Sequence, residues 1–281
     1  MALGGNPVFA KDKNFKDQPA GQFGYANGGA NTMAAQSQFS TQQLQDMYNK
    51  PAAGPAQTGR MSYDDVIMKT VMTLGLVLVG AALGWMIPVL MFPGMIVGLI
   101  LGLVNSFKKE PSPVLILLYA GFEGLFLGGL SGLLENMYPG IAIQAILGTL
   151  SVFVVTLVLF RNGKVRATPK MMRFFIIAMA GYALFSLINF FLMIFNVTTT
   201  PWGVNGMDIP GTNIPFGVVI GLLAIGLAAF SLIVDFTSIE KGIQNGVPAK
   251  YSWTAAFGLT VTLVWLYVEI LRLLAILRGN D

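Results

Sequence analysis

The stretch IPFGVVIGLLAIGLAAFSLIVDF, residues 214–236, contains no charged side chain before Asp235. About 20 apolar residues in an α-helix, at about 1.5 Å each, cross the roughly 30 Å hydrocarbon core of a bilayer. The stretch therefore predicts a membrane-spanning helix. Working outward from it, we count seven such stretches, at approximately residues 66–88, 91–107, 113–134, 139–160, 171–195, 214–236 and 253–277.

The composition of the whole chain supports this prediction. Of its 281 residues, 54% are hydrophobic and 11% are charged, whereas soluble domains have about 25% charged residues. The chain has no Cys and no His, which excludes disulfides, thiolate metal sites and haem ligation by His. We therefore predict an all-α integral membrane protein without a cofactor, and the identity of any bound metal is left open.

The first 60 residues differ from the rest. They are rich in Gly, Ala, Asn, Gln and Pro, and a segment so poor in large aliphatic side chains cannot offset its ordering entropy by burial. We predict a disordered cytoplasmic tail at 1–60 and a membrane domain at 61–281. Ser62 followed by Asp65 resembles a helix-capping box, so the first helix is expected to start there.

The loops between the predicted spans indicate the orientation of the chain. The formal net charge is +4, and Lys and Arg accumulate in short cytoplasmic loops of membrane proteins. The connections 88–93, 135–139 and 196–213 contain no Lys or Arg, and the alternate connections do. The pattern predicts a cytoplasmic N-terminus and a C-terminus outside, with only Arg278 against it. Because the orientation of the chain in the membrane explains the basic residues, we expect no nucleic-acid partner. The expected partner is the lipid bilayer.

Small residues recur at four-residue spacing along several spans, as at Gly80 and Gly84 and at Gly124 and Gly128. In membranes this spacing is typical of helix-packing seams. The motif GLSG at 129–132 matches the surroundings of the nucleophile in rhomboid proteases, but the chain has no His, and no Lys lies at comparable depth to act as base. No nucleotide-binding motif is present either, so we expect no enzyme and no catalytic residue.

Three acids and one Arg stand out within or beside the spans. Glu123 lies near the middle of the third span and has no partner nearby in sequence, so it either reaches across the bundle or is protonated. Glu269 and Arg272 are one turn apart on the last span, where they either form a buried pair or Arg272 extends outward. Asp235 ends the sixth predicted span and, from its position alone, is explained by a solvated helix end.

Three segments carry a resemblance to a known family: YAGFEGLFLGGLSGLLENMYPGI (119–141), FSLIVDFTSIEKG (230–242) and LYVEILR (266–272). Together with the seven spans they resemble the Bax inhibitor-1 family, also called the transmembrane Bax inhibitor motif family. The resemblance covers about residues 60–281, and the tail is similar to the N-termini of actinobacterial members. It implies six helices around a central C-terminal helix, and in some members a pH-sensitive calcium leak.

The resemblance also implies a gate. In such members an Asp at the end of the sixth helix and an Asp on the seventh share a proton, and two coupled carboxylates titrate as a pair. Asp235 matches the first of them, and Glu269 falls on the second through Leu266 and Tyr267. Arg272 replaces an Asn of the family pattern, and a fixed cation there favours a salt bridge over a shared proton.

These observations lead to two alternative functions. The first is a cation leak channel or transporter of the bacterial inner membrane for Ca²⁺ or H⁺, in which Asp235, Glu269 and Arg272 form the gate and Glu123 supplies an interior polar site. The second is a non-transporting regulator that binds other membrane proteins, such as a membrane protease, through the N-terminal tail.

Overall fold

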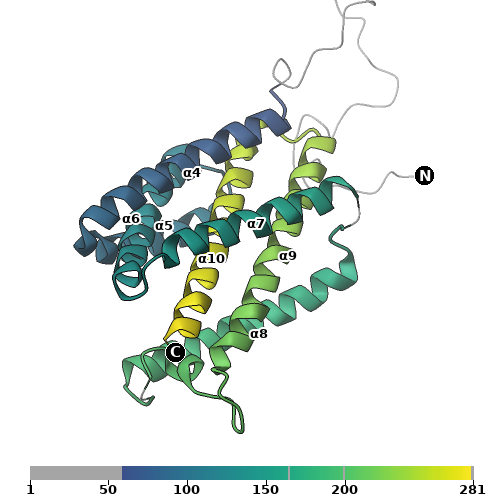
Figure 1. Ribbon diagram of the computed structural model, residues 1–281. Coiled ribbons are helices and arrows are strands. Elements are labelled where there is room, and N and C mark those ends of the chain that lie inside the picture. The colour runs from purple at the N-terminus through teal and green to yellow at the C-terminus, as the bar shows by residue number, and fades with distance from the viewer. Residues whose placement is uncertain (1–58, 164, 199, 280–281) are drawn as a thin grey trace, which may run out of the picture. The chain divides into compact units, whose positions relative to one another are not determined.

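A computed structural model describes residues 59–163, 165–198 and 200–279. Seven helices in this part of the chain are long and apolar enough to cross a membrane, which confirms the predicted all-α membrane fold (Figure 1). They are α4 (Tyr63–Met86), α5 (Met91–Phe107), α6 (Pro113–Met137), α7 (Ile141–Arg161), α8 (Pro169–Ile194), α9 (Phe216–Gln244) and α10 (Ser252–Arg278), with short 3-10 turns η2 (Pro88–Leu90), η3 (Gly203–Gly206) and η4 (Ala249–Tyr251). Almost all of the predicted tail, residues 1–58, lies outside the described residues.

The ends of the helices follow from local sequence. Ser62 Oγ accepts a hydrogen bond from the backbone N–H of Asp65 at 3.2 Å, which confirms the predicted cap of α4. Between α6 and α7 the chain turns at Gly140, whose φ of +84° is the left-handed conformation that glycine adopts without strain. The Glu135 carboxylate accepts hydrogen bonds from the N–H groups of Gly140 and Ala142, so it satisfies free donors at the start of α7.

The last helix, α10, is the central one. It packs against α4, α6, α7 and α9, and in Figure 1 it runs between α4 and α9. Leu266 and Leu271 of α10 are fully buried. The more peripheral α8 buries a single residue, Asn189, and exposes large apolar side chains such as Phe174 and Ile177, as a helix facing lipid does.

Glycine seams hold α4 against α6. A Cβ atom on Gly84 would collide with the backbone carbonyl of Leu125, and one on Gly128 would collide with that of Ala81. The two backbones therefore approach each other more closely than any larger residue would allow, which is the packing expected from the four-residue spacing of small residues. α5 uses the same device, since a Cβ on Gly94 would lie 2.7 Å from the backbone nitrogen of Phe126.

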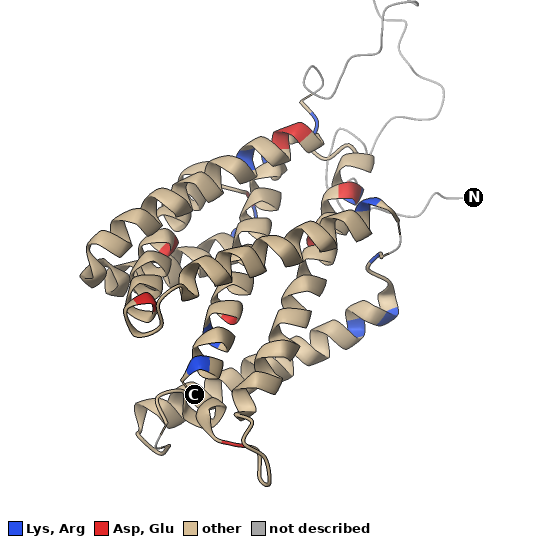
Figure 2. Cartoon of the chain, in the orientation of Figure 1, with Lys and Arg blue, Asp and Glu red and all other residues tan. Residues whose placement is uncertain are grey.

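Charges separate the two ends of the bundle. Most Lys and Arg residues of the described part of the chain lie at the end of the bundle where α4, α6, α8 and α10 begin, which we call the basic end (Figure 2). Three ion pairs lie there, Lys69–Asp65, Arg166–Glu240 and Lys250–Glu110. Helix α9 continues to Gln244 at this end, eight residues beyond the predicted boundary at 236, so Asp235 lies inside the helix and not at its end.

Candidate functional site: a carboxylate between α9 and α10

The side chain of Asp235 points from α9 toward α10. Its Oδ2 accepts a hydrogen bond from Thr262 Oγ1 at 2.7 Å, and Thr262 Oγ1 lies 3.4 Å from the Ser231 hydroxyl. Gly258 leaves space for the carboxylate, because a Cβ on this residue would lie 3.6 Å from Asp235 Oδ1. Asp235 is thus a partly buried carboxylate held by a hydroxyl of the central helix, not a solvated helix end.

A cavity of about 390 Å³ adjoins Asp235 at the basic end. Ser238 and Thr254 bring hydroxyl groups to its wall, and Tyr251 lines it from η4. Both Ser238 and Thr254 are exposed. The cavity therefore connects a carboxylate of the transmembrane region to the surface of the bundle through a partly polar lining.

The segment Gly59–Ser62 crosses the connection between α9 and α10 beside this cavity. Met61 N donates to the carbonyl of Val247 at 2.7 Å, and Ala249 N donates to the carbonyl of Gly59 at 2.8 Å. Met61 is only 4% exposed and lines the cavity together with Asp235. We call this segment the strap, since it fixes the start of α4 to the α9–α10 connection and partly covers the cavity.

Glu269 lies in a separate cluster further along α10. Its side chain is 4% exposed, and Oε2 lies 2.5 Å from Arg272 Nη2, so of the two alternatives the structure has the ion pair. Tyr182 of α8 and Trp265 both donate hydrogen bonds to Oε1. Arg272 Nη2 also donates to the Tyr182 hydroxyl at 3.4 Å, while Arg272 Nε is buried without a hydrogen-bond partner among the described residues. The charge of Glu269 is therefore balanced within this cluster by Arg272.

The structure does not bring Asp235 and Glu269 together. Thr262, the residue that faces Asp235, precedes Glu269 by seven residues, or about 10 Å along the helix axis. Seven residues are close to two helical turns, so Thr262 and Glu269 project from nearly the same face of α10. The family pattern therefore places Glu269 on the face of α10 that turns toward Asp235. The residue opposite Asp235, however, is Thr262, two turns earlier.

Glu123 lies apart from both groups, on the face of α6 that packs against α5. A Cβ on Gly98 of α5 would lie 2.8 Å from Glu123 Oε2, so the glycine leaves room for the carboxylate. Tyr119, one turn earlier on α6, packs edge-on against Phe257 of α10. Among the described residues Glu123 forms no hydrogen bond and no ion pair, and Arg272 is not its partner.

Comparison with known families agrees with this architecture. A family model described as "Bax inhibitor 1 like" matches residues 6–279 of the 281. The chain belongs to the Bax inhibitor 1-like family. The family match includes every helix described above, as well as most of the N-terminal tail. A search of curated proteins gave no match.

The sequence did not predict three features of the site in this Bax inhibitor 1-like protein: the roles of Thr262 and Tyr182, and the strap that contains Met61. Only Thr262 could have been found from the sequence, because it lies on the same helical face as Glu269. Tyr182 is one of many aromatic residues on an apolar helix, and Met61 precedes the helix cap, where an apolar residue commonly packs as a hydrophobic staple.

Proposed function

We propose that this Bax inhibitor 1-like protein is a passive cation leak for Ca²⁺ or H⁺, with Asp235 at its gate. One observation carries the proposal: Asp235 is an acid on a membrane helix, held by Thr262 and reached through an open cavity. Carboxylates within membrane segments are energetically costly, and they commonly mark ion pathways. Here the cavity beside the carboxylate opens at the surface of the bundle, so a cation could reach Asp235 from that side of the membrane.

The chemistry of the cavity constrains how each ion would pass. Ca²⁺ takes six to eight oxygen ligands, and among the described residues there is no cluster of three or more His, Cys, Asp or Glu. Asp235 and the hydroxyls of Ser238 and Thr254 supply only part of that number, so Ca²⁺ would pass largely hydrated. A proton needs only the carboxylate and water.

Further along the path the structure is closed. Leu266 lies between Thr262 and Glu269 on α10 and is fully buried, and no charged side chain of α10 follows Thr262 toward the opposite end until Glu269. There Arg272 forms an ion pair with the next carboxylate, Glu269, and Tyr182 donates a hydrogen bond to it. In the proposed leak the Glu269–Arg272 pair is the second part of the gate and opens only if α10 moves. Glu123 is a separate interior polar site.

Flux in liposomes tests the proposal. The full chain is reconstituted with a Ca²⁺ dye or a pH dye inside, and influx is recorded across a range of pH values. We expect flux that Asp235→Asn abolishes or makes independent of pH. The matched control is Asp208→Asn, since Asp208 is exposed in the loop before α9. Absence of flux at every pH, or equal flux for wild type and Asp235→Asn, contradicts the proposal.

The proposed location is a bacterial inner membrane, with the basic end in the cytoplasm. The asymmetry of Lys and Arg between the ends supports this orientation. In it the cavity at Asp235 opens to the cytoplasm and the C-terminus lies outside. We also propose that the protein has no enzymatic activity.

The second candidate is a membrane regulator that binds other membrane proteins. The apolar faces of α8, which buries only Asn189, support this alternative, because they are available to another transmembrane helix. The N-terminal docking segment predicted for this function lies outside the described residues. Deleting residues 1–55 separates the two proposals: capture of a partner is lost if the tail docks it, while any cation flux is retained.

A further inference from the structure

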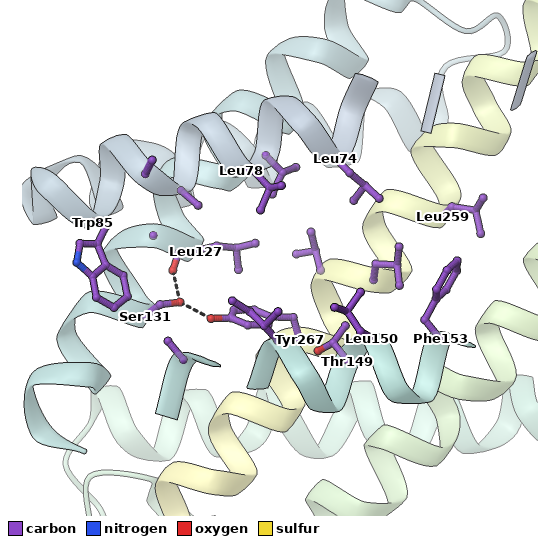
Figure 3. A pocket seen from close by; sticks show the side chains of 18 of the residues that line it. Leu74, Leu78, Trp85, Leu127, Ser131, Thr149, Leu150, Phe153, Leu259 and Tyr267 are labelled. Carbon is purple, nitrogen blue, oxygen red and sulfur yellow. Dashed lines mark hydrogen bonds between the residues drawn. The ribbon is translucent and has the colours of Figure 1, made fainter. Parts of the chain in front are cut away.

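An apolar cleft opens on the flank of the bundle, away from Asp235 and from Glu269. It has a volume of about 460 Å³ and is walled by α4, α6, α7 and α10. Figure 3 shows side chains from these helices converging on it, with Leu78 on α4 and Leu150 on α7 at opposite sides. Along α4 the lining runs from Thr70 to Trp85, which corresponds to about 22 Å at 1.5 Å per residue.

The floor and the rim of the cleft differ in exposure. Leu127, Leu259 and Val264 on the floor are 6–7% exposed, whereas Leu78 and Leu150 on the rim are 69% and 53% exposed. Both rim helices are among the seven that can span the membrane. The cleft therefore opens sideways toward hydrocarbon, and its floor is reached only through the gap between the rims.

Every hydroxyl group on the cleft wall already has a partner. Thr70 and Thr149 donate to carbonyls of the preceding helical turn, at 2.8 and 2.7 Å. Ser131 donates to Leu127 O at 2.6 Å and lies 2.7 Å from the Tyr267 hydroxyl, as drawn in Figure 3. Because no hydroxyl hydrogen is left to donate to a polar ligand, the walls favour an apolar occupant.

We infer that this cleft binds one acyl chain of a membrane lipid. Its volume lies within the range of about 300–1,000 Å³ found for sites of small molecules. A transmembrane helix, about 10–12 Å wide with its side chains, would have to approach over the Leu78 and Leu150 rims. Such approaches normally use small residues, whereas the exposed rim positions Leu78 and Leu150 carry large side chains. A single alkyl chain enters between the rims and contacts the floor.

Photo-crosslinking with a lipid tests this inference. The full-length protein is reconstituted in phosphatidylcholine vesicles that contain a phosphatidylcholine with a diazirine on one acyl chain. After illumination, labelled residues are mapped by mass spectrometry. Lipid surrounding the protein labels exposed residues of every helix. Only a chain inside the cleft labels the buried floor residues Leu127, Leu259 and Val264, and we expect labels on them.

A bulky side chain at the rim supplies the matched comparison. Ala82 lines the cleft and is exposed, so Ala82→Trp should fill the cleft and remove floor labelling without disturbing the core. Ala180→Trp, on an exposed position of α8, should leave floor labelling unchanged. Leu150→Trp repeats the test from α7 if Ala82→Trp does not fold.

Three results overturn the inference. The first is labelling confined to exposed residues in the wild type, which shows that lipid chains do not enter. The second is floor labelling that persists in both filled variants. The third is a crosslink between two protein chains through cleft residues, obtained with diazirine amino acids at Leu78 or Leu150, which shows that a second copy or a partner helix occupies the cleft.

Discussion

Thr262 donates a hydrogen bond to Asp235 at 2.7 Å, and this bond joins the sixth spanning helix to the central one. The partner of the carboxylate on α10 is therefore a hydroxyl group. Glu269, seven residues later, has its own cation in Arg272. Two acids that the family pattern pairs are thus held separately, one by a neutral donor beside a cavity and the other by a charge in the packed interior.

Replacing Thr262 tests the importance of this bond. Thr262→Val keeps the shape of the side chain but removes the donor, so the Asp235 carboxylate loses its only hydrogen bond among the described residues. Interhelical hydrogen bonds in membrane proteins contribute about 0.6 to 1.7 kcal/mol. We expect Thr262→Val to lower the midpoint of thermal unfolding in detergent, measured by circular dichroism. Thr262→Ser keeps the hydroxyl and should remain near wild type; equal losses in both variants would assign the effect to packing.

The fold could be predicted because it depends on local properties of the chain. Seven apolar stretches, the Ser62 cap and the glycine spacing each act within a few turns of helix. The partner of Asp235 could not be predicted, because it depends on how far α9 and α10 slide past each other, and helical periodicity is the same for Thr262 and Glu269. The full length of α9 was not predicted either. Glu240 and Lys241 interrupt the apolar pattern, but the helix continues to Gln244.

Removal of one partner of the Glu269–Arg272 pair should strongly destabilise the folded protein. Arg272→Gln leaves a buried carboxylate with only Tyr182 and Trp265 as donors, and breaking a buried pair costs about 3–5 kcal/mol. Unfolding in detergent is the measurement. The double variant Glu269→Gln/Arg272→Gln should recover part of the loss, because no unpaired charge remains. If the double variant loses the sum of the two single losses, the residues do not act as a pair.

Trp265 provides a second measurement for the same pair. Its indole nitrogen donates to Glu269 at 3.1 Å, so the fluorescence emission of Trp265 should shift in Glu269→Gln. The difference spectrum between each protein and its Trp265→Phe variant isolates this signal from the other three Trp residues of the chain. An unchanged emission would indicate that the carboxylate does not contact the indole in the folded protein.

The glycine seam between α4 and α6 predicts opposite effects for two identical substitutions. Alanine favours a helix over glycine by up to about 1 kcal/mol. At Gly128, however, the added Cβ collides with the carbonyl of Ala81, and overpacking costs about 1–3 kcal/mol. Gly128→Ala should therefore destabilise the bundle. Gly226→Ala on α9, where nothing lies within 4 Å of the new atom, should be neutral or stabilising. Equal thermal midpoints for the two variants would contradict the close approach of α4 and α6.

The Met61 strap should limit access of water-soluble reagents to the Asp235 cavity. The chain contains no Cys, so Ala255→Cys places a unique thiol at a partly buried position of the cavity wall. A membrane-impermeant maleimide should react with it slowly, and Met61→Ala should accelerate the reaction because the buried thioether no longer covers the cavity. Ser131→Cys, at the apolar cleft in the membrane domain, should resist the reagent in both backgrounds. Equal rates with and without the Met61→Ala substitution would rule out a covering role for the strap.

The sidedness of a thiol at the exposed Ser238 tests the orientation proposed from the basic end. Ser238 lies on the cavity beside the strap, whereas Thr212 is exposed in the connection between α8 and α9 at the opposite end. With the basic end in the cytoplasm, Ser238→Cys should react with the impermeant maleimide in inside-out vesicles of an expressing bacterium and not in intact spheroplasts. Thr212→Cys should show the reverse. If Ser238→Cys reacts from outside, the Asp235 entrance faces the exterior, and a cation leaking inward would meet the carboxylate before it meets the Glu269–Arg272 pair.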